Sequence, residues 1–63
     1  MIIYLNTKHF YQITYLNLFG YLSVREIKIK SIDKKHIVAF DNLCNELRTF
    51  KINRIKSIKL LNQ

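Results

Sequence analysis

The sequence predicts an all-β fold of about five short antiparallel strands, and three features of the 63 residues indicate it. Residues 24–30, VREIKIK, alternate apolar and charged side chains, which is the pattern of a strand with one buried face. Residues 36–40, HIVAF, are a run of β-branched and aromatic residues typical of a buried strand. Residues 47–53, LRTFKIN, alternate again. A chain this short forms a single domain, spanning residues 1–63, with a small core.

The segments around these strands complete the prediction. Polar residues at 33–35 (DKK) and 41–45 (DNLCN) suit turns, and Gly20 lies in a loop at 17–21. Further strands are expected at 11–16 (YQITYL), at 57–61 (SIKLL) and, as an additional N-terminal strand, at 1–6 (MIIYLN).

One strand is predicted to be irregular. Ile27 and Ile29 share one face, but Ile32 is out of phase with them. This change of phase predicts a bulge or sharp bend near Lys30 and Ser31.

A helix is the alternative for the C-terminal third. Apolar side chains recur there every three to four residues, and Asp41 or Asn42 suits a helix N-cap. Such a basic amphipathic helix would suit a DNA groove. Mediocre helix formers such as Thr49 and Ile55, and the charge of Arg54 within the apolar stripe, favour strands. The spacing in question is that of Leu43, Leu47, Phe50, Arg54, Ile58 and Leu61.

The charge is strongly positive and unevenly placed. The net charge is +7 and the pI is about 9.9. Lys8 is the only charged residue up to Val24, whereas ten basic and four acidic residues follow. This balance attracts anions such as nucleic acid, nucleotides or acidic membrane surfaces. The joint abundance of Lys, Asn and Ile also fits AT-rich coding, which would supply lysines without a function.

Several classes of protein are not expected. Cys44 is the only cysteine, so the chain has no internal disulfide, and with His9 and His36 it does not make a zinc site. A lone cysteine suits a reducing compartment, so a cytoplasmic location is expected. No stretch suits a membrane-spanning helix or a secretory signal, and we expect no membrane partner. The scattered acids and the absence of a glycine-rich loop predict no enzyme activity and no cofactor.

Two segments together resemble a known family. Residues 11–32, YQITYLNLFGYLSVREIKIKSI, and 36–55, HIVAFDNLCNELRTFKINRI, are similar to the core of a WYL domain. The most specific part is RTFKINRI at 48–55, which resembles an Arg-Thr-Phe-Arg-Leu-Asp-Arg-Ile segment. The Trp-Tyr-Leu triplet itself is absent, because its place is taken by Lys35, His36 and Ile37. Lys51 and Asn53 replace the more usual Arg and Asp.

The resemblance implies a fold and a role. WYL domains imply a small SH3-like (Sm-like) barrel made of a strongly bent antiparallel sheet. They also imply a regulatory module that senses nucleic acid or a nucleotide-like anionic ligand on behalf of an effector, with DNA and RNA not distinguished. The helix-turn-helix or helicase that usually accompanies the family does not fit into 63 residues.

The candidate site consists of cations on the core-facing side of the predicted strands. Arg48 and Arg54 share the parity of Phe50 and Ile52, and in a small barrel they would emerge at its rim. Arg25, by its parity with the isoleucines after it, would be a third. Arginine matches phosphate in a bidentate manner, so the three are expected to converge on one anion. Ion pairs of the rim arginines with Asp41 or Glu46 are the structural alternative. The full set of candidate residues is Arg25, Arg48, Arg54, Lys51 and His36, with Lys51 on an outer face. His36 fits a partly buried polar residue, and it could hydrogen-bond a base or phosphate if it lies beside the arginines.

An assembly module is the alternative function. The first third of the chain is aromatic and nearly uncharged, and exposed apolar surface of that kind marks interfaces. An unpaired edge strand, such as residues 1–6, would then pair with a second copy to form a homodimer.

Overall fold

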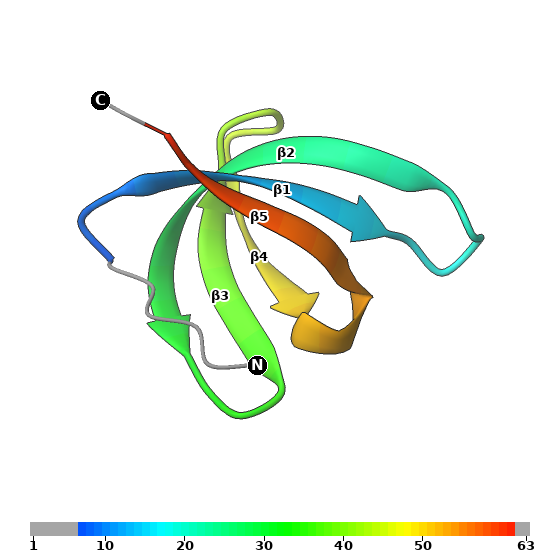
Figure 1. Ribbon diagram of the computed structural model, residues 1–63. Coiled ribbons are helices and arrows are strands. Elements are labelled where there is room, and N and C mark those ends of the chain that lie inside the picture. Colours follow the sequence, from blue (N-terminus) through cyan, green and yellow to red (C-terminus); the bar gives the residue numbers. More distant parts are fainter. Residues whose placement is uncertain (1–6, 62–63) are drawn as a thin grey trace.

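The computed structural model describes residues 7–61 and contains five antiparallel strands in one sheet (Figure 1). The sheet order is β4-β3-β2-β1-β5. A single turn of 3-10 helix, η1, joins the last two strands. The elements are β1 (Phe10–Leu16), β2 (Leu22–Ile32), β3 (His36–Asp41), β4 (Glu46–Lys51), η1 (Ile52–Arg54) and β5 (Ile55–Leu61). The predicted all-β fold is confirmed, while the strand expected at residues 1–6 lies outside the described part.

The sheet curls into a small SH3-like barrel. Strands β1 and β4 are separated by two other strands in the sheet order, yet the Lys51 N–H donates to the Tyr15 hydroxyl at 3.0 Å. The Tyr15 ring also meets the Phe50 ring edge-on, with centroids 5.1 Å apart. Contact between such distant strands requires a strongly bent sheet, as expected for a barrel of this size.

The core follows the alternation of the sequence. Ile27 and Ile29 of β2 are buried between exposed charged neighbours, as their parity predicts. The β2–β3 register shifts between Ile29 and Ser31, which confirms the predicted bulge. The buried apolar side chains are Tyr11, Ile13, Ile27, Ile29, Ile37, Ala39 and Phe50, with Tyr15, Ile52, Ile55 and Ile58 packed against them.

The helical alternative for the C-terminal third is wrong. Residues 46–51 and 55–61 are strands, and η1 is the only helical turn among residues 7–61. Isoleucine, threonine and phenylalanine have low helix propensity, and pairing with β3 and β1 gives their side chains a buried face. Among residues 7–61, no helix is both long and apolar enough to cross a membrane.

Polar side chains shape the two turns that frame the candidate site. The Asn17 side-chain oxygen accepts hydrogen bonds from the N–H groups of Phe19 and Tyr21, and Gly20 supplies a φ of 85°. The Asp33 carboxylate accepts hydrogen bonds from the N–H groups of Lys35 and His36. Asx turns of this kind fix the ends of β1, β2 and β3.

Candidate anion-binding site

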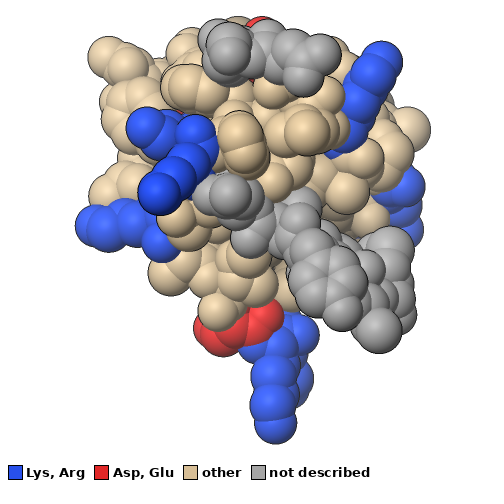
Figure 2. Space-filling model, turned by 60° about the vertical axis from the view of Figure 1, so that its left-hand side comes forward, with Lys and Arg blue, Asp and Glu red and all other residues tan. Residues whose placement is uncertain are grey.

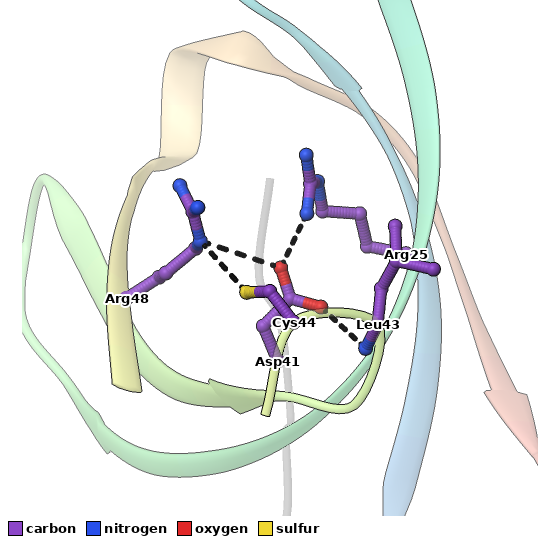
Figure 3. A network of polar contacts seen from close by, with 5 residues as sticks. All are labelled: Arg25, Asp41, Leu43, Cys44 and Arg48. Carbon is purple, nitrogen blue, oxygen red and sulfur yellow. Dashed lines mark hydrogen bonds and ion pairs between the residues drawn. The ribbon is translucent and has the colours of Figure 1, made fainter. Parts of the chain in front are cut away.

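Two of the predicted arginines meet at one buried carboxylate. Asp41, at the end of β3, is completely buried, and its Oδ2 accepts a hydrogen bond from Arg25 Nη1 at 2.6 Å. Arg48 Nε lies 3.6 Å from the same oxygen and donates to Cys44 Sγ at 3.2 Å (Figure 3). The other carboxylate oxygen, Oδ1, accepts from the Leu43 N–H at 2.9 Å. These five residues form the Asp41 cluster.

The Asp41 cluster favours the ionised carboxylate. Burial alone opposes ionisation, but the hydrogen bonds from the Leu43 N–H and from Arg25 outweigh it, so the pKa of Asp41 lies below its usual value. One carboxylate faces two guanidinium groups, which leaves the cluster with a formal surplus of one positive charge. Ion pairing of a rim arginine with Asp41 was expected as the alternative to an anion site. The structure shows this ion pair for Arg48, and Arg25 pairs with the same carboxylate.

Arg54 does not join this cluster, contrary to the prediction that three arginines converge. Its Nη1 donates to the carbonyl oxygens of Asn17 and Leu16, at 3.2 and 3.5 Å. The reason is η1: the strand alternation that places Arg48 and Phe50 on one face stops at Lys51, so parity no longer relates Arg54 to them. Arg54 is also not ion-paired with Asp41 or Glu46, the two acids proposed for it.

His36 and Lys51 instead lie with Arg54 in a concave surface. The two residues are partners across the β3–β4 ladder. Both residues line two hollows, one of about 440 Å³ and one of about 430 Å³. We call the combined surface the basic groove. It is lined by Tyr15, Asn17, Leu18, Phe19, Lys34, Lys35, His36, Thr49, Lys51, Ile52, Asn53 and Arg54.

The basic groove combines cations with an aromatic border. Its lining includes the side chains of three lysines, Arg54 and His36, and no carboxylate. Asp33 lies beside it, with Oδ1 3.6 Å from His36 Nδ1, and its carboxylate is already used in the turn before β3. The Phe19 ring is 84% exposed at the groove margin.

Sequence reasoning missed Phe19 and the lysines of the turn, Lys34 and Lys35. The available signal for Phe19 was its place directly before the only glycine, since a large apolar residue at the tip of a tight turn cannot reach the core. Two tyrosines of β1 belong to the interior instead: Tyr11 is 5% exposed, and Tyr15 packs against Phe50.

The positive charge is not confined to the basic groove. Figure 2 shows Lys and Arg side chains projecting at several separate places around the margin of one face. Outer-face lysines such as Lys28, whose Nζ lies 5.6 Å from the centroid of the Phe10 ring, add to the general field. A test of the groove must therefore compare lysines at equal net charge.

The Tyr15 hydroxyl connects the core to the floor of the basic groove, and Tyr15→Phe tests that link. The Lys51 N–H would lose its acceptor in a water-accessible position, so we expect a loss of about 0.5–1.5 kcal/mol in the free energy of unfolding. Urea titration followed by far-UV circular dichroism measures it. Tyr21→Phe is the matched control, because Tyr21 is 71% exposed, and its stability should remain that of the natural chain.

Neither a metal site nor a similarity to known proteins indicates what this surface binds. Within residues 7–61, no group of three or more His, Cys, Asp or Glu side chains could hold a metal ion. No family model matches the chain, and no curated protein matches it. The resemblance to WYL domains stays a prediction, and the observed geometry carries the functional argument.

Proposed function

We propose that this protein is a binding module for single-stranded nucleic acid or a nucleotide-like anion, and that the basic groove is its site. The observation that carries the proposal is a hollow lined by Lys51, Arg54 and the exposed Phe19, which shares His36 and Lys51 with a second hollow lined by two more lysines. No Asp or Glu lines either hollow. Proteins that bind single strands combine a positive groove for the phosphates with aromatic side chains on which bases stack.

Each part of the groove has a separate task in this proposal. The ammonium group of Lys51 and the neighbouring lysines of the turn before β3 neutralise phosphates. The Phe19 ring, exposed at the tip of the β1–β2 hairpin, offers a stacking surface for a base. His36, whose side chain is 38% exposed, supplies a ring nitrogen for a hydrogen bond to a base or phosphate.

The Asp41 cluster takes a supporting part. Arg25 and Arg48 share one carboxylate, so half of their formal charge is compensated, and Arg48 remains 46% exposed. A regulatory role, in which occupancy of the groove controls an effector, rests on the WYL resemblance alone.

The test compares two lysines that differ only in place. Lys51→Gln and Lys59→Gln remove the same charge, but Lys59 lies on β5 and does not line the groove. With a fluorescein-labelled single-stranded oligonucleotide, Lys51→Gln should weaken binding several-fold. It should also reduce the slope of log affinity against log salt by about 0.7, the value for one phosphate contact on a single strand. Lys59→Gln should have a smaller effect on affinity.

A second variant tests stacking separately from charge. Phe19→Ala should weaken binding by about 1–3 kcal/mol without changing the salt slope. Leu43→Ala, at a similarly exposed apolar residue outside the groove, should leave affinity unchanged. Equal losses from the two lysine variants would show a general charge effect, and that result would refute the groove. Parallel titrations with DNA, RNA and duplex determine which class of nucleic acid binds.

A further inference from the structure

The first half of β2 lacks a strand on one side. Its residues Leu22–Arg25 pair with β1, but the ladder with β3 begins only at Ile27 and Asp41. No other strand among residues 7–61 lies along this side. Figure 1 shows the result, because the β1–β2 hairpin extends well beyond the β3–β4 hairpin. We call Leu22–Arg25 the free edge.

The backbone groups that point outward at the free edge can be identified. The Asn42 N–H donates to the Glu26 carbonyl at 3.0 Å, so Glu26 directs its backbone groups toward the side of β3. Successive residues of a strand address opposite neighbours, so Leu22 and Val24 point the same way as Glu26. Their two N–H and two C=O groups make a short template for another strand.

The side chains at the free edge are apolar and exposed. Leu22 is 61% exposed and Val24 56%, and Tyr21 beside them is 71% exposed. Large apolar side chains gathered next to unpaired backbone groups are the combination that native proteins usually avoid on a solvated edge. A partner strand would cover both at once.

The charge distribution indicates what that partner is. The chain carries a net charge of +7, which opposes self-association almost everywhere on its surface. Residues 9–24, however, contain no charged side chain, and Arg25 is engaged with Asp41. A twofold contact brings identical surfaces together, and here the residues that would face each other, Leu22, Ser23 and Val24, are uncharged.

We propose that a second copy of this chain adds to the free edge, with the twofold axis at Ser23. When the twofold axis is perpendicular to the sheet, paired residues of the two copies have their side chains on the same face of the sheet. The register centred on Ser23 pairs Leu22 with Val24 of the partner, and Val24 with Leu22 of the partner. In this register, the N–H and C=O groups of Leu22 and Val24 all form hydrogen bonds with the partner. The hydrogen bond from the Asn42 N–H to the Glu26 carbonyl is kept. A continuous sheet across two barrels is the result, with the two apolar pairs on its outer face.

The main experiment measures mass against concentration by analytical ultracentrifugation. The natural chain should shift from monomer to dimer as its concentration rises. Val24→Glu, which buries a charge at the contact, should stay monomeric, whereas Leu60→Glu should dimerise like the natural chain. Leu60 is the matched control because it is 53% exposed on β5. A natural chain that is monomeric at every concentration would overturn the proposal and leave another occupant, such as the first six residues. Dimerisation of Val24→Glu as strong as that of Leu60→Glu would overturn it too.

A cross-link tests the register. Ser23 of each copy would face its twin as a non-hydrogen-bonded pair, with Cα atoms about 4.5 Å apart, within the range that a disulfide bridges. In a Cys44→Ser background, Ser23→Cys should form a covalent dimer under mild oxidation, and Thr49→Cys, exposed on β4, should not. Equal cross-linking of the two variants, or none for Ser23→Cys, contradicts this arrangement. The proposal uses no residue of the basic groove, so loss of oligonucleotide binding and loss of dimerisation are separate results.

Discussion

Asp41→Ala is expected to lower the free energy of unfolding by about 3 kcal/mol. Removing one partner of a buried ion pair costs about 3–5 kcal/mol, because the other charge is left without compensation. Arg25 and Arg48 keep some access to water, with side chains 22% and 46% exposed, so the lower end of that range applies. The variant also loses the acceptor for the Leu43 N–H. Urea titration by far-UV circular dichroism gives the measurement.

Two comparisons separate the causes of that loss. Asp41→Asn keeps an oxygen for the Leu43 N–H but not the charge, so it should recover part of the stability. Glu46→Ala removes an exposed acid directly opposite Asp41 on β4 and should change stability by less than about 0.5 kcal/mol. If Asp41→Ala and Glu46→Ala have the same free energy of unfolding, the Asp41 cluster does not stabilise the fold.

The same carboxylate makes stability depend on pH in a defined direction. The pKa of Asp41 in the folded chain lies below its value in the unfolded chain, so its contribution is complete above about pH 4. That contribution is lost as the pH falls through the folded-state pKa. The stability difference between the natural chain and Asp41→Asn should therefore narrow on acidification. The Asp33 carboxyl also has a lowered pKa, mainly through the Lys35 and His36 N–H groups, but it is present in both chains and cancels.

The strands were predictable because their signal is local. Alternation around Ile27 and Ile29, and the polar residues at the turns, depend only on neighbouring positions and survive in the structure. The placement of the cations was only partly predictable. The alternation correctly assigned Arg48 and Phe50 to one face. No local sequence signal predicted the 3-10 turn η1, which ends the alternation before Arg54.

The sequence identified three residues of the basic groove, His36, Lys51 and Arg54, but not the groove itself, because its lining comes from separate turns. Lys35 follows β2, Lys51 ends β4, and Phe19 lies at the tip of the β1–β2 hairpin. They meet only because the sheet curls, and the degree of curling depends on contacts between strands that are not neighbours. Asp41 was named as a turn residue and as an ion-pair partner for the rim arginines, but its complete burial and its bond to Arg25 on the neighbouring strand β2 depend on the fold.

Phe50→Ala is expected to have the largest effect of all, a loss of about 3–4 kcal/mol in the free energy of unfolding. The Phe50 side chain is 3% exposed, and truncating a buried phenylalanine leaves a cavity in addition to the lost transfer free energy. A chain of this length has a total stability of only about 3–9 kcal/mol, so Phe50→Ala should remove about a third of it or more. Urea titration followed by far-UV circular dichroism measures the loss.

Phe50→Leu tests the connection between this core residue and the basic groove while keeping the fold. It retains most of the buried volume but not the edge-on contact with the Tyr15 ring. Because the Tyr15 hydroxyl accepts the Lys51 N–H, that amide should exchange its hydrogen faster in Phe50→Leu than in the natural chain. Amides of the β1–β2 ladder away from Tyr15 serve as the internal control. Unchanged exchange at Lys51 would mean that the groove floor is set by η1 and the β3–β4 ladder, independently of the aromatic pair.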